Sequence, residues 1–212
     1  VVISETNVAP LHAQVALDSL EKANIDAHLL TFPAGESNKT LTTASMLLDG
    51  LFSHDPPIDR KAVVVAFGGG VTGDLAGFVA AVALRGIRFV QVPTTLLAAV
   101  DSSVGGKTGV DHAAGKNLIG AFHQPAGVLA DVNALRTLPL RELRNGLAEC
   151  VKHALIRDAS LLAFIEANVE TLLAGQDGAL AFDADVMAEL IARNVTIKSR
   201  IVSEDEREAG ED

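Results

Sequence analysis

The sequence has a single cysteine, no apolar run long enough to cross a membrane and no excess of basic residues. Cys150 alone cannot form an internal disulfide, which fits a reducing compartment. Gly, Thr, Asp or Arg interrupts every apolar stretch before it reaches the ~18 residues that a membrane helix needs, so we expect a soluble, cytoplasmic protein. The net charge of -10 argues against nucleic-acid binding, because phosphate backbones select basic surfaces. An anionic ligand would therefore need a local cluster of cations.

Glutamate is absent between Ser37 and Arg141, and the region from Val63 to Pro125 is rich in glycine and apolar residues. The few charged residues of that region stand alone in the sequence: Asp74, Arg85, Arg88, Asp101, Lys107, Asp111 and Lys116. An unpaired buried charge is costly, so we expect these side chains to meet a ligand or a partner charge.

Hydrophobic periodicity divides the 212 residues into two parts. The first part alternates predicted strands with predicted helices, which favours an α/β fold with a parallel sheet; the strands are 1–4, 28–32 and 61–67, and the helices are 11–23 and 40–52. From Pro139 onward the pattern predicts amphipathic helices, near 141–157, 159–174 and 183–206. We therefore expect an α/β domain over 1–138 and the first part of an all-α domain over 139–212.

The third predicted strand runs directly into a glycine-rich turn, Gly68 to Gly73, followed by a predicted helix from Asp74 to Leu84. This G-x-G-x-x-G pattern between a strand and a helix is typical of dinucleotide binding, because glycine lets backbone N–H groups approach a pyrophosphate. The acidic residue expected about 20 positions later is missing, since 89–95 contains neither Asp nor Glu. The alternative is that the glycines only form a tight turn and allow close packing of helix on strand.

The segment from Asp101 to Thr108, DSSVGGKT, superficially resembles the phosphate-binding loop of nucleotide triphosphatases. That motif needs glycine where Asp101 stands and a strand leading into it, so we reject this interpretation. Lys107 and Lys116 remain candidates for binding phosphate or carboxylate groups, and the alternative is that both are ordinary solvated lysines.

Glu149, Lys152 and His153 lie on one face of a predicted helix. Glu149 and His153 have the i, i+4 spacing of a metal-binding pair. The alternatives are a weak surface ion pair between Glu149 and Lys152 and a purely structural histidine.

Five segments extend these motifs over nearly the whole chain: GGGVTGDLAGF, LRGIRFVQVPTTLLAAVDSSVGGKTGV, GKNLIGAFHQP, TLPLRELRNGLAECVKHALI and EDEREAG. Together they resemble the 3-dehydroquinate synthase family of sugar-phosphate cyclases, which acts in the shikimate pathway to aromatic amino acids. The resemblance implies a Rossmann-like NAD-binding domain followed by a helical domain that binds zinc, or cobalt, and substrate. The family also implies a homodimer.

The resemblance further implies roles for individual residues. NAD would be bound by Asn7, Glu36, Lys39, Gly69, Gly70, Val71, Asp74, Thr94, Thr95, Lys107, Lys116 and Thr137. The substrate, 3-deoxy-arabino-heptulosonate 7-phosphate, would be contacted by Arg85, Asp101, Lys107, Lys116, Asn117, Lys152 and Lys198. Glu149 matches the carboxylate ligand of zinc.

The family's two other zinc ligands are histidines downstream of EDEREAG, and none of the six histidines in this sequence matches them. We therefore expect a fragment that lacks a complete metal site. Glu5 stands where the family commonly has Asp, and Glu211-Asp212 also departs from the family pattern.

The implied reaction begins when NAD oxidises a substrate hydroxyl. Phosphate is then eliminated, the same cofactor returns its hydride, and an intramolecular aldol closure gives 3-dehydroquinate. Two alternatives stay open: another sugar-phosphate cyclase or a metal-dependent polyol dehydrogenase, and an NAD-binding fragment that is inactive as it stands.

Overall fold

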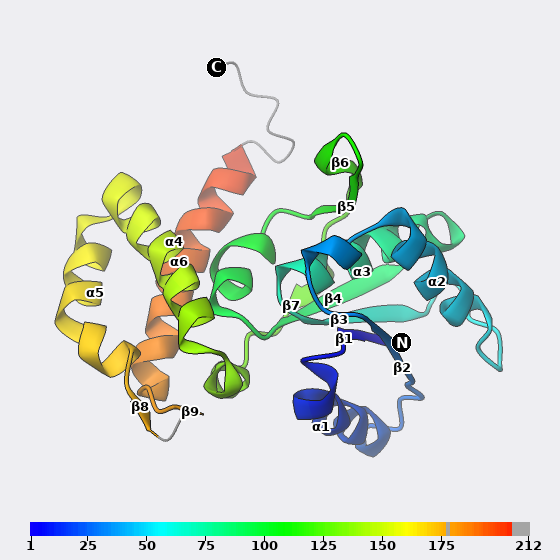
Figure 1. Ribbon diagram of the computed structural model, residues 1–212, viewed down its shortest axis with the longest axis horizontal. Helices are drawn as coiled ribbons and strands as arrows, with labels where there is room; N and C mark the ends of the chain where they lie inside the picture. The colour runs from blue at the N-terminus through cyan, green and yellow to red at the C-terminus, as the bar shows by residue number, and fades with distance from the viewer. Residues whose placement is uncertain (177–178, 205–212) are drawn as a thin grey trace. The chain divides into compact units, whose positions relative to one another are not determined.

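The computed structural model describes residues 1–176 and 179–204, which form two compact units (Figure 1). The first unit comprises Val1–Pro93 and Gly106–Leu129, and the second comprises Thr94–Gly105 and the chain from Ala130 onward. The last predicted helix, near 183–206, ends in an acidic stretch, and from residue 205 onward this prediction lies outside the described residues. The predicted boundary between two functional domains, at residues 138 and 139, stays a prediction, because the two compact units reflect how the chain packs and not what each part does.

The first unit contains a parallel sheet of five strands in the order β2-β1-β3-β4-β7. Their bounds are β1 (Val2–Glu5), β2 (Leu29–Phe32), β3 (Val63–Gly68), β4 (Arg88–Pro93) and β7 (Gly127–Val128). In the register of the sheet, Ile3 pairs with Leu30 on one side and with Ala66 on the other. The parallel α/β arrangement predicted from the sequence is confirmed.

Helices cover both faces of this sheet: α1 (Ala9–Lys22), α2 (Leu41–Phe52) and α3 (Gly70–Val82). Val2 and Phe67 pack against residues of α1 on one face. Ile3 and Ala66, which point to the opposite face because side chains alternate along a strand, pack in the larger core with α2 and α3. Two short 3-10 helices, η1 (Glu36–Asn38) and η2 (Ala83–Arg85), complete the connections.

Helix α3 begins four residues earlier than the sequence predicted, at Gly70 instead of Asp74. Gly69 is its extended N-cap, and Gly73 donates a backbone hydrogen bond to the Gly69 carbonyl. A Cβ on Gly73 would lie 2.6 Å from Oε1 of Gln91 on β4, so glycine here also lets the helix lie close to the sheet. The glycines therefore serve close packing as well as the turn.

A β-hairpin that the sequence analysis did not predict completes the first unit. Its strands are β5 (Lys107–His112) and β6 (Gly115–Phe122), which pair antiparallel. Strand β5 packs on α3, where a Cβ on Gly77 would lie 2.5 Å from the Thr108 methyl group. The sequence analysis assigned no strand or helix to this segment, because its glycines obscure the alternation of a strand.

The second unit is mainly helical, as expected. It contains the π-helix η3 (Ala98–Ser102), the 3-10 helix η4 (Val132–Thr137), α4 (Leu140–Arg157), α5 (Ala159–Leu172), α6 (Ala184–Glu204), and the short strands β8 (Gly175–Gln176) and β9 (Ala179–Leu180). A Cβ on Gly146 of α4 would lie 2.6 Å from the Leu96 Cβ, so α4 packs closely on the segment before η3. Among the described helices, none is long and apolar enough to cross a membrane.

Candidate metal and ligand-binding site

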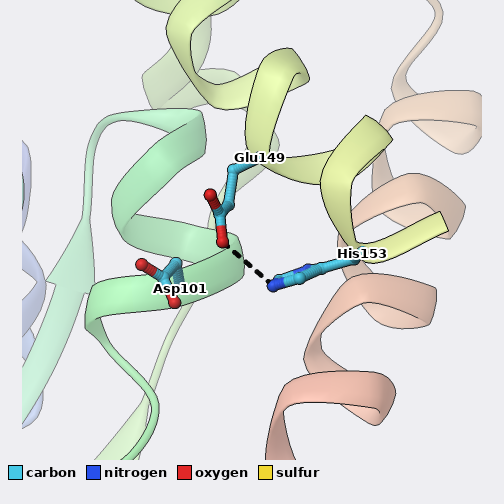
Figure 2. A group of neighbouring side chains, drawn as sticks. All are labelled: Asp101, Glu149 and His153. Carbon is cyan, nitrogen blue, oxygen red and sulfur yellow. Dashed lines mark ion pairs between the residues drawn. The ribbon is translucent and has the colours of Figure 1, made fainter. Parts of the chain in front are cut away.

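Two elements of the second unit bring three potential metal ligands together. Asp101 comes from η3, and Glu149 and His153 come from successive turns of α4, so that their ligand atoms all lie within 4.8 Å of one another (Figure 2). The two residues of α4 meet because positions i and i+4 share one face of a helix. Close packing of α4 near η3 then brings in Asp101.

Two lysines pair with the carboxylates of this cluster. Lys152 Nζ lies 2.5 Å from Glu149 Oε1, and Lys198 Nζ on α6 lies 2.8 Å from Asp101 Oδ1. The Lys152 side chain is 58% exposed, so its cation faces solvent while the Glu149 carboxylate, 16% exposed, lies beneath it. The predicted substrate residues Asp101, Lys152 and Lys198 are thus close neighbours of the predicted metal ligand.

His153 is buried at the inner side of the cluster. Its Nδ1 lies 3.0 Å from Asn194 Oδ1 on α6, and its Nε2 lies 3.2 Å from Glu149 Oε1. Asn194 is fully buried and was not predicted, because nothing in the sequence marks one polar position inside an apolar helix face.

The donor atoms of this cluster fit a divalent transition metal. Two carboxylates and one imidazole are ligands that zinc and cobalt accept, and three protein ligands leave a position open, as in catalytic zinc sites. Glu149 Oε1 is buried, and among the described residues none gives it a contact with the angles of a hydrogen bond, although its ion-pair distances are short. A cation would satisfy this oxygen.

In the first unit, the predicted cofactor residues follow the carboxyl ends of successive parallel strands. Asn7 follows β1, Glu36 and Lys39 follow β2, and the turn Gly69–Val71 with Asp74 follows β3. The first two connections are joined by a hydrogen bond from the Ala34 N–H to Thr6 Oγ1, 3.1 Å long. Ligands of open α/β sheets bind at this edge, so the placement fits a dinucleotide.

Lys39 links three segments at this edge. Its buried ammonium group donates to Asp74 Oδ2 at 2.5 Å and to Asn117 Oδ1 on β6 at 2.6 Å. Burial raises the pKa of Asp74, and the hydrogen bond and charge of Lys39 oppose this rise. The backbone N–H of Asp111 donates to the Lys39 carbonyl, which further anchors the hairpin.

The other predicted residues of the first unit are less closely grouped. Lys116 Nζ lies 3.1 Å from Glu36 Oε1, and the Lys116 side chain is largely exposed while that of Glu36 is partly exposed. Lys107 begins β5 and is exposed. Arg85 lies in η2, between the end of α3 and the start of β4, and therefore at the opposite edge of the sheet from the glycine turn.

Three predicted threonines belong to the second unit. Thr95 Oγ1 accepts a 3.1 Å hydrogen bond from the Ala98 N–H at the start of η3. Thr94 is buried, and its Oγ1 has no hydrogen-bond partner within the described part of the chain. Thr137 ends η4, where its hydroxyl donates to the Ala134 carbonyl.

The chain resembles known 3-dehydroquinate synthases along its length. The family model of the N-terminal domain of 3-dehydroquinate synthase matches residues 29–145, and that of the C-terminal domain matches residues 146–212. The 3-dehydroquinate synthase of Symbiobacterium thermophilum is 51% identical over 98% of this chain and 56% of its own length. The 3-dehydroquinate synthase of Citrifermentans bemidjiense is 48% identical over 99% of this chain and 55% of its own length. The chain therefore spans little more than half the length of these relatives.

Solved structures agree with this family. A 2-epi-5-epi-valiolone synthase from Streptomyces hygroscopicus subsp. jinggangensis, with NAD+ and Zn2+ bound, has a TM-score of 0.89 and 30% identity over 98% of this chain and 56% of its own. A 2-deoxy-scyllo-inosose synthase complexed with carbaglucose-6-phosphate, NAD+ and Co2+ has a TM-score of 0.87 and 32% identity. The match covers 98% of this chain and 55% of that synthase. A glycerol dehydrogenase from Schizosaccharomyces pombe, at a TM-score of 0.70 and 16% identity over 93% and 53%, shares the fold alone. By sequence along its whole length and by fold, this chain belongs to the 3-dehydroquinate synthase family.

Proposed function

We propose that this chain supplies the NAD-binding and part of the substrate-binding machinery of a 3-dehydroquinate synthase. The reaction is the conversion of 3-deoxy-arabino-heptulosonate 7-phosphate to 3-dehydroquinate and phosphate. The enzyme would thus be a phosphate-eliminating lyase of the shikimate pathway. Bound NAD would supply reversible oxidation of the substrate, and zinc or cobalt would supply a Lewis acid.

One observation carries the proposal: residues predicted separately from η3, α4 and α6 meet in one charged cluster. Asp101 pairs with Lys198, and Glu149 pairs with Lys152. A cluster that combines metal-ligating carboxylates with ammonium groups suits an anionic sugar phosphate held beside a metal ion. Its two ammonium groups are each paired with a carboxylate here, and they are the cations that an anionic ligand would approach.

The start of α3 supports NAD binding. Gly69, its N-cap, has no side chain and makes no side-chain capping hydrogen bond. The free N–H groups of a helix N-terminus, together with the helix dipole, favour a pyrophosphate. Gly70 and Val71 would then donate from the backbone, with Asp74 held in place by Lys39.

The remaining cofactor and substrate residues are part of the proposal. NAD would also contact Asn7, Glu36, Lys39, Thr94, Thr95, Lys107, Lys116 and Thr137, and the substrate would also contact Arg85, Lys107, Lys116 and Asn117. The functional division into 1–138 and 139–212, a homodimer and a cytoplasmic location belong to the same proposal. Light scattering after size exclusion tests the dimer.

The test begins with NAD+ binding to the 212-residue chain, measured by calorimetry. Phosphate release is then measured on 3-deoxy-arabino-heptulosonate 7-phosphate, both with this chain and with a chimera that adds the C-terminal remainder of the Symbiobacterium relative. We expect NAD+ binding by both proteins and phosphate release by the chimera. Lys152→Met should abolish that release, whereas Lys22→Met, an exposed lysine on α1, should not change it. A chimera that binds NAD+ and is inactive on every sugar phosphate would refute the proposed reaction.

A second candidate is another sugar-phosphate cyclase, favoured by the TM-score of 0.89 to the valiolone synthase. Sedoheptulose 7-phosphate and glucose 6-phosphate, offered in the same assay, distinguish the two. Preferential phosphate release from either compound would replace the first candidate by the second.

A further inference from the structure

The orientation of the Asn117 side chain follows from its contact with Lys39. The Lys39 ammonium group lies 2.6 Å from Asn117 Oδ1, and an ammonium group carries hydrogen-bond donors only. The amide must therefore turn its oxygen toward Lys39, and its Nδ2 group, which can only donate, points away from that lysine. Asn117 is exposed, and no residue in the described part of the chain accepts a hydrogen bond from Nδ2.

Further contacts hold Asn117 and Lys39 in place. The backbone of Asn117 is left-handed, with φ of 55°, a conformation that asparagine tolerates better than most residues. Its N–H donates to Asp111 Oδ1 at 2.8 Å, and the Asp111 N–H donates to the Lys39 carbonyl at 2.8 Å. Lys39 itself is 3% exposed and also donates to Asp74 Oδ2. Both the backbone and the side chain of Asn117 are thus tied to a buried lysine.

A donor fixed beside a buried cation suits an anionic ligand. Lys39 polarises the amide, and hydrogen bonds in series strengthen one another, so Nδ2 becomes a better donor. The preceding residue, Lys116, places a cation nearby, and its ion pair with Glu36 is open to solvent and therefore weak. Phosphate oxygens accept hydrogen bonds from both amide and ammonium donors.

We propose that Lys39 is a positioning residue for Asn117: it fixes the amide so that Nδ2 donates to the phosphate group of the substrate. The inference rests on the proposed function, in which Asn117 contacts the substrate and Lys39 was assigned to NAD alone. It adds that one buried ammonium group serves both the cofactor edge of the sheet and the phosphate donor on the hairpin.

The test is a titration of the isotope-labelled 212-residue chain with inorganic phosphate, in the presence of NAD+, followed by NMR of the Asn117 Nδ2 protons. We expect phosphate to shift these protons downfield. Asn117→Ala should weaken phosphate binding by about 10- to 100-fold, because one hydrogen bond to a charged acceptor is lost. Asn117→Asp should weaken it by about 100-fold or more, because one oxygen then accepts from Lys39 and the other faces the anion.

Asn24→Asp is the matched control for the added negative charge. Asn24 follows the end of α1, is exposed and has the same left-handed backbone, with φ of 56°. This variant should bind phosphate as the original chain does.

A pair of variants separates positioning by Lys39 from its contribution to stability. Asp74→Asn keeps Lys39 and should keep the Asn117 amide fixed. Lys39→Met combined with Asp74→Asn removes the ammonium group without leaving an unpaired carboxylate. Nitrogen-15 relaxation of Asn117 Nδ2 should report a rigid amide in the first variant and a mobile one in the second. Phosphate binding should be about 10-fold weaker in the second variant, and hydrogen exchange of β3 amides checks that both are folded.

The outcomes distinguish this inference from the proposed function. The inference is overturned, even with an active chimera, by any of three results: Nδ2 protons that do not respond to phosphate, a folded Asn117→Asp variant that binds phosphate as tightly as the original chain, or an amide that is equally rigid without Lys39. If phosphate binding depends on Asn117 and Lys39 while the chimera releases no phosphate from any sugar phosphate, the inference stands and the proposed reaction fails.

Discussion

Replacing Lys39 with methionine should destabilise the first unit by about 3 kcal/mol. The Lys39 side chain is 4% exposed and that of Asp74 is 23% exposed, so the substitution leaves a largely buried carboxylate without its cation. Removing one partner of a buried pair typically costs 3–5 kcal/mol. We take the lower end of this range because Asp74 keeps some contact with solvent. Asn117 loses a hydrogen-bond donor at the same time.

The cost should depend on pH in a defined direction. Burial already raises the pKa of Asp74 above its ordinary value of 3.8, and Lys39 opposes this rise. A carboxyl with a raised pKa in the folded state lowers stability as pH increases from the unfolded to the folded pKa. Without Lys39 the pKa of Asp74 in the folded state rises further, so the pH interval over which stability falls extends to higher pH. The loss should therefore be small near pH ~4, where the carboxyl is mostly protonated in the folded variant, and complete near pH ~7.

Hydrogen exchange of β3 amides, followed by mass spectrometry and corrected for the intrinsic rate at each pH, measures this loss. At neutral pH, a loss of about 3 kcal/mol corresponds to exchange about 100-fold faster. Lys116→Met is the matched control, because its ion pair with Glu36 joins side chains that are 71% and 40% exposed; it should cost less than ~1 kcal/mol. Adding Asp74→Asn to Lys39→Met should restore most of the stability. An equal loss at both pH values, or a double variant no more stable than Lys39→Met, would refute the reasoning.

Two further predictions test packing in each unit. In the first, a Cβ on Gly120 would overlap the carbonyl oxygen of Thr108, whereas no described atom lies within 4 Å of a Cβ on Gly127. Gly120→Ala should therefore destabilise by about 2 kcal/mol or more in urea unfolding, and a Gly127→Ala control should be near neutral; equal stabilities would contradict the register of the hairpin. In the second unit, Cys150 is fully buried. This burial and, to a smaller extent, the negative charge of Glu149 raise the pKa of its thiol to about 12. Iodoacetamide should thus modify the folded chain at least about 100-fold more slowly than the urea-unfolded chain, and comparable rates would contradict this burial.

The parts of the fold that were predicted correctly follow from local signals. The apolar β3 strand, running directly into glycines, identified the parallel sheet and the turn at its carboxyl edge. The start of α3 was misplaced because glycine is a poor helix former. The structure shows why glycine stands inside this helix: a Cβ on Gly73 would lie 2.6 Å from Gln91 Oε1. The hairpin was missed for a related reason: Gly109 and Gly120 face each other across the strands, a fit that only the paired structure makes visible.

The sequence by itself determined the family, the parallel α/β arrangement of the first unit, the helical second unit and the identity of most candidate residues, because these depend on periodicity and on motifs of neighbouring residues. Only the tertiary structure decided that Asp101 meets Glu149, that Lys39 is shared by Asp74 and Asn117, and that Asn194 fixes the ring of His153. Each of these contacts joins residues at least 35 positions apart. No local pattern specifies such a partner, since it is the packing of whole helices and strands that brings the two side chains together.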